Sequence, residues 1–387
     1  MLDVLYVSSY TPRECGIATF TEDLTKSIDA LHVLKPASIV SVNDPSSSYN
    51  YGKEVVMQLE EDDKRTYSRV ADRINSSDYD LINVQHEFGL FGGDWGDYLL
   101  TFLRKLSKNS ITTMHTTLSP DSEVFQSPES AAAHDSVVKE IGRISSAVVV
   151  MTKMAADILK EGYGVDADKI KIIPHGCPPM PFVPSDPEKE ALGLGGRTVL
   201  ATFGLLSRDK GIENAIKALP EIVKEWPDIL YLVIGETHPK VRLNEGEKYR
   251  NALLRLVKDL ELRGNVRFHN RFLSKTELIQ YLHATDVYIC PYVKKEQLSS
   301  GTVTYALGAG KAIISTPFYY AQEVLAGGRG LLCEFNSPVS ITEGIRQLLK
   351  HPEQKAHMEK LAYEYSRQMT WPRVATKYVS LFREVIR

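Results

Sequence analysis

The chain has 387 residues, of which 43% are hydrophobic and 25% charged, and its formal net charge is −3. This composition is typical of a globular protein, and the length exceeds what one hydrophobic core supports, so we expect two domains. The slight acidic surplus argues against a general nucleic-acid binder, because phosphate contacts require a basic surplus. No run of about eighteen apolar residues occurs, so the sequence predicts neither a transmembrane segment nor secretion. Peripheral contact with a membrane stays open.

The four cysteines are widely scattered and show no paired metal-ligand spacing: they are Cys15, Cys177, Cys290 and Cys333. Cysteines in this arrangement fit a reducing compartment, and we therefore expect a cytoplasmic protein. Cys15 lies in a polar loop without a recognisable base beside it, which argues against a nucleophilic role.

The first half of the chain alternates short apolar runs with helical patterns. Buried strands are predicted at residues 2–7, 37–42, 81–84, 110–114, 147–151 and 171–173. Helices are predicted between them, among others at 20–31 and 94–106. This alternation is typical of a parallel sheet with helices on both faces. A proline-rich stretch at 174–184 then breaks the pattern, and we place a linker at 179–189.

The alternation restarts in the second half of the chain. Strands are predicted near residue 199 and at 230–234, 266–268, 287–290, 312–315 and 330–333. The predicted fold class is α/β, with two doubly wound, Rossmann-like domains at 1–178 and 190–370 that face each other across a cleft. A final helix at 371–387 carries an apolar stripe that needs a surface to cover, and the first domain is one candidate.

A segment at 297–311 lies between two predicted strands and contains a Ser/Gly turn that opens a helix. Such a turn presents uncompensated backbone N–H groups and the positive end of the helix dipole, which suit it to hold a diphosphate. The candidate residues in the turn are Ser299, Ser300, Gly301 and Thr302. An ordinary strand-to-helix turn would look the same, so this segment alone leaves both interpretations open.

A second loop, at 204–211, supports the diphosphate-binding interpretation of the first. It begins with Gly204 after a predicted strand and carries two cations, Arg208 and Lys210. Ligands bind at the carboxyl ends of strands in open α/β sheets, and cations there would neutralise phosphate charge. Loop cations are also commonly just solvated, which is the alternative for either residue alone.

Together these motifs resemble the GT-B glycosyltransferases of the retaining family 4. The family's Gly-Arg-Leu-x-x-x-Lys-Gly loop is matched at 204–211, with Lys210 in register. Leu205 occupies the position of the family arginine, and we infer that Arg208 substitutes for that arginine. The family's Glu-x7-Glu signature aligns with Gln297 and Tyr305, so both acidic positions are changed. In the family the first glutamate contacts the donor sugar and the second the ribose, so these departures put the sugar and the nucleotide in doubt.

The resemblance extends to the first domain. The segment at 11–20 matches the family's glycine loop and retains Gly16, and glycine lets a backbone approach a ligand closely. His115 follows a predicted strand and aligns with the family histidine near the donor sugar and the reacting centre. A lone histidine is more often structural, but this position and the alignment favour a functional role. We assign His86 and Glu87, which follow another strand, to the acceptor side.

The resemblance implies a retaining transferase that moves a hexosyl unit, with mannose or glucose favoured, from a UDP- or GDP-linked donor to a hydroxyl of a saccharide or glycoconjugate. His115, Arg208 and Lys210 would form the catalytic set. We expect no metal or other cofactor, because the cations and the turn amides would stabilise the leaving diphosphate and no Asp-x-Asp pair ends a predicted strand.

Two alternatives remain. One is a sugar phosphorylase of the same fold, with inorganic phosphate held by Arg208, Lys210 and Ser300. The other is a non-catalytic nucleotide-sugar-binding protein, which the loss of both signature glutamates suggests.

Overall fold

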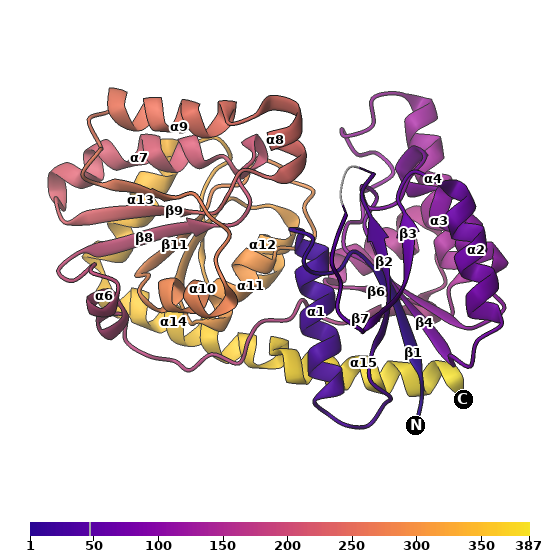
Figure 1. The fold of residues 1–387 in the computed structure, drawn as a ribbon. Helices are drawn as coiled ribbons and strands as arrows, with labels where there is room; N and C mark the ends of the chain where they lie inside the picture. The colour runs from indigo at the N-terminus through magenta and orange to yellow at the C-terminus, as the bar shows by residue number, and fades with distance from the viewer. Residues whose placement is uncertain (46–47) are drawn as a thin grey trace. The chain divides into compact units, whose positions relative to one another are not determined.

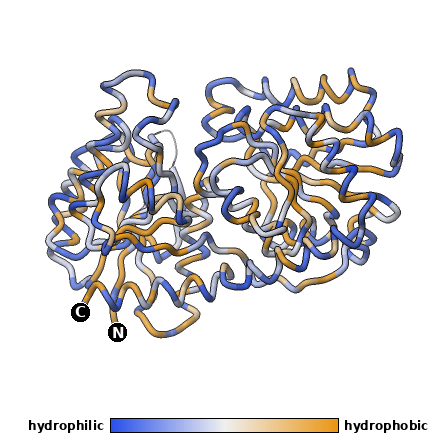
Figure 2. The backbone as a smooth tube through the Cα atoms, turned by 180° about the vertical axis from the view of Figure 1, so that it is seen from behind, coloured by the Kyte–Doolittle hydropathy of each residue, from blue (hydrophilic) through white to orange (hydrophobic). Residues whose placement is uncertain are grey.

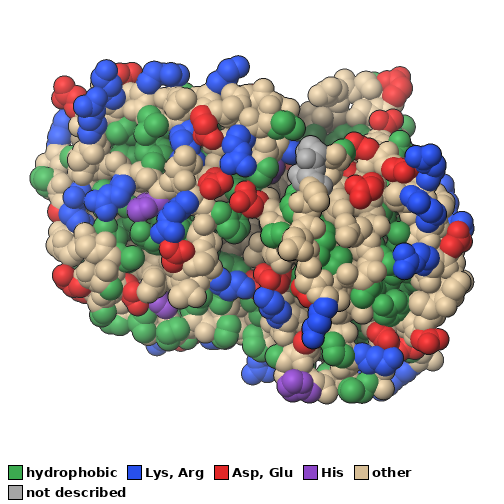
Figure 3. Space-filling model, viewed as in Figure 1, with side chains coloured by type: hydrophobic (Ala, Val, Ile, Leu, Met, Phe, Trp, Pro, Cys, Tyr) green, Lys and Arg blue, Asp and Glu red, His purple; other side chains and the backbone are tan. Residues whose placement is uncertain are grey.

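The computed structural model describes residues 1–45 and 48–387, and the chain divides into two compact units. The first unit comprises Met1–Gly176, Glu296–Ser299 and Trp371–Arg387, and the second comprises Cys177–Lys295 and Ser300–Thr370. Each unit has one parallel sheet with helices packed against it (Figure 1), which confirms the predicted α/β class. Figure 3 shows basic and acidic side chains interspersed over both units, as a net charge near zero leads one to expect.

The first unit has a seven-stranded sheet with the order β3-β2-β1-β4-β5-β6-β7. Its strands are β1 (Val4–Ser8), β2 (Ser38–Asn43), β3 (Val55–Glu60), β4 (Leu81–His86), β5 (Ser110–Met114), β6 (Ala147–Val150) and β7 (Ile170–Ile172). Its α-helices are α1 (Gly16–Asp29), α2 (Lys64–Asn75), α3 (Tyr98–Lys105), α4 (Pro128–Ile144), α5 (Lys153–Asp157) and α15 (Trp371–Ile386).

The central strands β1 and β4 are buried along their whole length. Burial explains the apolar run of β1, whereas β4 also buries the polar residues Asn83, Gln85 and His86. The edge strand β3 alternates between partly buried and exposed residues, and our sequence analysis missed it. The helix predicted at 94–106 is confirmed only from Tyr98 to Lys105, and its predicted start was wrong. The chain forms a 3₁₀ turn at Asp94–Gly96 and then α3, because Trp95 and Gly96 both have positive φ and interrupt the helix.

The C-terminal helix α15 belongs to the first unit. Its buried side chains include Val374, Tyr378 and Phe382. They pack in one hydrophobic core with Phe20 and Leu24 of α1 and with residues of β1, β2, β4, β5 and β6. Figure 1 shows α2 and α3 on the other side of this sheet. The apolar stripe of the last helix therefore covers one face of the first sheet.

The second unit has a six-stranded sheet with the order β10-β9-β8-β11-β12-β13. Its strands are β8 (Thr198–Phe203), β9 (Ile229–Ile234), β10 (Val266–His269), β11 (Val287–Cys290), β12 (Ala312–Ser315) and β13 (Leu331–Leu332). Its α-helices are α6 (Asp186–Ala191), α7 (Ile212–Glu225), α8 (Pro239–Glu245), α9 (Lys248–Asp259), α10 (Lys275–His283), α11 (Gly301–Gly308), α12 (Tyr319–Val324), α13 (Pro338–Lys350) and α14 (Pro352–Ser366). Figure 2 shows hydrophobic segments running through the middle of this unit, whereas hydrophobic and hydrophilic residues alternate along the surrounding coils.

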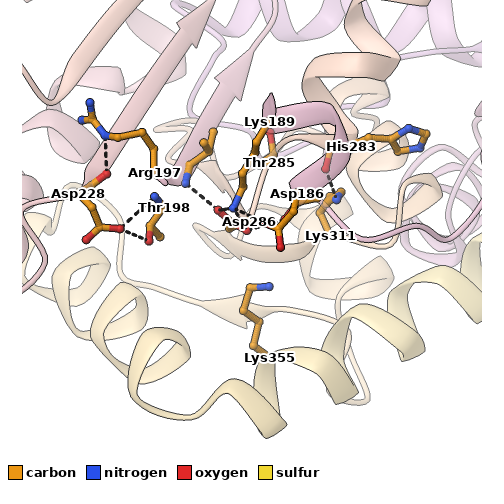
Figure 4. A network of polar contacts seen from close by, with 12 residues as sticks. Asp186, Lys189, Arg197, Thr198, Asp228, His283, Thr285, Asp286, Lys311 and Lys355 are labelled. Atoms are coloured by element: carbon orange, nitrogen blue, oxygen red, sulfur yellow. Dashed lines mark hydrogen bonds and ion pairs between the residues drawn. The ribbon is translucent and has the colours of Figure 1, made fainter. Parts of the chain in front are cut away.

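A network of polar contacts fixes the amino ends of these strands (Figure 4). The carboxylate of Asp286, just before β11, accepts hydrogen bonds from Lys189 Nζ at 2.8 Å and from the backbone N–H of Val199 at 2.7 Å. Asp228 accepts from the hydroxyl of Thr198 at the start of β8, at 2.6 Å. The contact of Asp286 links the amino ends of β8 and β11, and that of Asp228 links the amino ends of β8 and β9.

Candidate functional site

The strand order of the second sheet brings the two predicted phosphate loops together. The order reverses between β8 and β11, which pair directly with each other, and ligands bind at the carboxyl end of such a reversal. The loop at 204–211 follows β8, and the loop that leads to α11 follows β11. The sequence analysis placed a candidate site on each loop, and the sheet topology makes them neighbours.

Two glycines shape the loop after β8. Gly204 has φ of 126° and Gly211 has φ of 58°, values that other residues rarely adopt. A Cβ atom at Gly211 would lie 2.2 Å from the carbonyl oxygen of Pro291, so only glycine lets this loop approach the end of β11. Between the glycines, Arg208–Lys210 form a single 3₁₀ turn.

Helix α11 begins at the predicted Ser/Gly turn. Ser300 is its N-cap, and the Ser300 hydroxyl accepts a hydrogen bond from the backbone N–H of Val303 at 3.3 Å. The other N–H groups of the first turn, including those of Gly301 and Thr302, have no acceptor within the helix. Together with the helix dipole they form a positive surface suited to phosphate oxygens.

Tyr292 connects the two loops, and the sequence analysis did not single it out. Its ring lies beneath the ammonium of Lys210, whose Nζ is 3.8 Å from the ring centroid. Its hydroxyl is 2.9 Å from Oγ1 of Thr302, which is 3.2 Å from the hydroxyl of Ser300. Burial raises the pKa of Tyr292, so the hydroxyl keeps its proton. Lys210, Ser300 and Thr302 therefore form one cluster around a buried tyrosine.

Arg208 does not join this cluster. Its side chain is largely exposed, and its guanidinium lies 3.4 Å from the carboxylate of Glu245 and 5.7 Å from the ring centroid of Tyr249. Leu205, at the family's arginine position, carries no charge. The cationic character of the cluster therefore comes from Lys210 and the amides of α11.

The two residues that align with the family glutamates have different surroundings. Tyr305 is 7% exposed and packs in the hydrophobic core of the second unit, with its ring centroid 6.4 Å from that of Phe203. Gln297 belongs to the segment Glu296–Ser299 of the first unit, and its amide donates to the carbonyl oxygen of Ser299 at 2.8 Å.

His115 lies just after β5 in the first unit and is 4% exposed. Its Nε2 is 2.9 Å from Oε1 of Gln85, and the ring of Phe20 meets its ring edge-on with 4.6 Å between centroids. Burial lowers the pKa of His115 well below its ordinary value, and His175 and His86 lower it further, so the imidazole is neutral. The Ser299 hydroxyl donates to the backbone carbonyl of His115 at 2.8 Å, which joins two of the predicted site residues.

The predicted acceptor-side residues lie at the end of β4. His86 is fully buried, and its ring packs against Phe88 and Phe91. Burial lowers its pKa to about 3. His86 therefore presents no surface to an acceptor in this structure. Glu87 is partly buried, and its carboxylate accepts a hydrogen bond from the hydroxyl of Thr116 at 2.7 Å.

Gly16 is the first residue of α1. A Cβ atom at this position would meet nothing within 4 Å, so the fold of the first unit does not itself require a glycine there. Among the described residues, no cluster of three or more His, Cys, Asp or Glu side chains could hold a metal ion. In the same part of the chain, every helix is too short or too polar to cross a bilayer.

Two units that each have a parallel sheet with helices packed against it, one of them with Lys210 and the N-terminus of α11 at its strand reversal, match the architecture of the GT-B class. Comparison with known families gives the same result. The family model "Glycosyl transferases group 1" matches residues 185–365, and the model "Glycosyltransferase Family 4" matches residues 52–179. The chain belongs to glycosyltransferase family 4, whose members transfer sugars from nucleotide-sugar donors.

Individual relatives are distant. Spore coat protein SA of Bacillus subtilis is 23% identical over 365 residues, which cover 90% of this chain and 89% of that protein. A GDP-mannose-dependent phosphatidylinositol monomannoside mannosyltransferase of Corynebacterium glutamicum is 26% identical over 197 residues, 48% of each chain. The crystal structure of Anabaena HepE in complex with UDP superimposes with a TM-score of 0.76 at 16% identity, over 99% of this chain and 100% of that one.

Proposed function

We propose that the protein is a retaining hexosyltransferase that moves glucose or mannose from a UDP- or GDP-linked donor to a hydroxyl of a saccharide or glycoconjugate. The observation that carries the proposal is the cluster of Lys210, Tyr292, Ser300 and Thr302, which places an ammonium group beside the first turn of α11. A cation and a set of helix amides form a site for a diphosphate.

The chemistry follows from where charge develops. When the glycosidic bond to the donor breaks, negative charge grows on the nucleoside diphosphate, and donors held in place beforehand stabilise it without reorganisation. Lys210 and the N–H groups at 301–302 fill that role. Because these groups already supply positive charge, we expect neither a metal ion nor another cofactor to be needed. Arg208 is the second cation of the proposal, and it must leave Glu245 to reach a phosphate.

The remaining assignments concern the sugar and the acceptor. We assign His115 to the donor sugar, and its neutral ring suits hydrogen bonds with hydroxyl groups. The proposal contains no carboxylate nucleophile. The acceptor hydroxyl attacks the anomeric carbon on the face from which the diphosphate leaves, its oxygen forms the new glycosidic bond as the bond to the diphosphate breaks, and its proton passes to the leaving phosphate oxygen. Glu87 is the residue we assign to the acceptor side.

The donor assignment draws support from the relatives. HepE has been crystallised with UDP-glucose, and the corynebacterial relative is GDP-mannose-dependent. Calorimetric titrations with UDP, GDP and ADP test the base, and we expect UDP or GDP to bind more tightly than ADP. Transfer from the matching glucose or mannose donor to a panel of saccharides, with NMR analysis of the product anomer, tests retention. An inverted anomer, or no binding of any of the three nucleotides, would refute the proposal.

One observation favours a second candidate. Tyr305 is buried against Phe203 at the position where the family binds ribose through a carboxylate. A site without that carboxylate suits a sugar phosphorylase, in which inorganic phosphate occupies the Lys210 cluster. Incubation with disaccharides and phosphate distinguishes the two, because only the phosphorylase forms a sugar 1-phosphate.

A further inference from the structure

A line of polar side chains runs through the apolar core of the first unit. Asn83 and Gln85 of β4 and Thr113 of β5 are each 0% exposed, and the strand register sets Gln85 beside Thr113. All three lie on the face that α1 and α15 cover, where the hydroxyl of Tyr378 is 3.0 Å from Oγ1 of Thr113. Buried polar groups cost free energy unless they are hydrogen-bonded, so this line calls for a physical explanation.

The hydrogen bonds that link Ile111, Asn83, Gln85 and His115 run in one direction. Nδ2 of Asn83 donates to the carbonyl oxygen of Ile111 at 3.5 Å, and Oδ1 of Asn83 accepts from Nε2 of Gln85 at 2.6 Å. Gln85 therefore presents Oε1, its acceptor end, to Nε2 of His115 at 2.9 Å. Reversing both amides would set Oδ1 of Asn83 against the carbonyl of Ile111, with two acceptors facing each other.

This direction determines which ring nitrogen of His115 carries the proton. An amide oxygen has no hydrogen to give, so Nε2 of His115 must be the donor. A neutral imidazole with a proton on Nε2 has a lone pair on Nδ1. None of the described residues donates a hydrogen bond to Nδ1. The ring is thus an acceptor at Nδ1 and has no proton to offer there.

We propose that Gln85 is a positioning residue for sugar transfer, which holds His115 as the neutral Nε2–H tautomer with Nδ1 as its acceptor. This inference rests on the proposed function through the role of His115. It deepens that function, because such a ring can accept a hydrogen bond from a hydroxyl of the donor sugar but cannot protonate the leaving diphosphate from Nδ1. Stabilisation of the leaving group then falls to Lys210 and α11.

The tautomer can be measured without any substrate. In protein labelled with ¹⁵N-histidine, long-range ¹H–¹⁵N spectra distinguish protonated from unprotonated ring nitrogens, and loss of a signal in His115→Gln assigns the residue. We expect a protonated Nε2 and a bare Nδ1 in the full-length protein at neutral pH. A proton on Nδ1 would overturn the inference even if the enzyme is an active transferase.

Two substitutions of Gln85 test the positioning role. Gln85→Met replaces the amide by a side chain of similar size that lacks the acceptor Oε1, so we expect a mixture of His115 tautomers. We also expect kcat to fall by about tenfold or more, with little change in KM for the donor. Gln85→Glu keeps an acceptor, and we expect it to retain the proton on Nε2.

The matched control is Thr112→Val. Thr112 lies in β5, the strand that leads to His115, and on the opposite face of the sheet. The substitution removes its buried hydrogen bond of 2.8 Å to Ser145. We expect this control to keep the wild-type tautomer and kcat, with melting temperatures showing that all variants fold. Wild-type kcat in a folded Gln85→Met, or an equal loss in Thr112→Val, would refute the positioning role. A wild-type protein that shows the expected tautomer but no transfer with any donor would instead count against the proposed function.

Discussion

Replacing Lys210 by alanine tests the charge stabilisation on which the proposed function depends. The ammonium lies 3.8 Å from the centroid of the Tyr292 ring, and Tyr292 is 1% exposed, so the ring forms a fixed platform. A cation held in this way loses little further freedom when it meets a phosphate. Its contribution should therefore be largest where the diphosphate carries most charge, which is in the transition state.

The size of the effect follows from the contact that is lost. A hydrogen bond to a charged group contributes about 1.5–3 kcal/mol, and each 1.4 kcal/mol corresponds to about a tenfold change in rate. The charge that develops on the leaving group places Lys210 near the upper end of that range. We therefore expect Lys210→Ala to lower kcat/KM for the donor by about 10²-fold. Nucleotide affinity should fall by a smaller factor.

The assay pairs donor turnover with calorimetric titration of the nucleoside diphosphate for the same variant. Lys294→Ala serves as the matched control, because Lys294 is a nearby cation that already pairs with Asp209 at 2.9 Å. We expect the control to stay within about threefold of wild type, as is usual for an exposed ion pair. Equal effects of the two substitutions would refute the reasoning, since they would show that Lys210 acts only as part of the general surface charge.

Three further predictions concern the same cluster. Activity should survive EDTA, because Lys210 and the amides of α11 supply the positive charge, and loss of turnover that magnesium or manganese restores would contradict this. Tyr292→Phe should keep the ring beneath Lys210 but lose the hydrogen bond to Thr302, so we expect turnover to fall by about three- to tenfold. Tyr292→Leu removes the ring as well, and we expect turnover to fall nearly as far as in Lys210→Ala. Tyr305→Glu should tighten nucleotide binding in calorimetry by restoring the family's acidic ribose contact, and weaker binding would show that the buried tyrosine has a role of its own.

The sequence was a good guide to the elements that are buried on both faces. Apolar runs identified the central strands of both sheets, whereas β3 was missed because it is an edge strand in which only Leu59 is buried. The helix predicted at 94–106 began too early for a different reason. Its apolar spacing is helical, but the positive φ of Trp95 is set by the surrounding loop, and periodicity does not report backbone conformation.

For the candidate site, the sequence located loops better than contacts. Lys210 and Ser300 were predicted as site residues because a loop between a strand and a helix is recognisable from residue order alone, and the structure places both in one cluster. Tyr292 and Gln85 were missed, because a tyrosine or a glutamine at the end of an apolar strand looks like part of the core. Their roles depend on the pairing of β8 with β11 and of β4 with β5, which residue order does not reveal.

We expect the departures from the family pattern to affect donor recognition more than the chemical step. The ammonium of Lys210, the ring of Tyr292 and the hydroxyl of Thr302 are linked by contacts within the second unit that involve neither Gln297 nor Tyr305. The groups that we propose to stabilise the leaving diphosphate can therefore persist while both acidic positions change. The family carboxylates contact hydroxyl groups of the donor sugar and the ribose, so their loss should alter which nucleotide sugar is selected. A donor screen of this protein should accordingly show a shifted preference with turnover retained, and Tyr305→Glu should move that preference toward the family's usual donors.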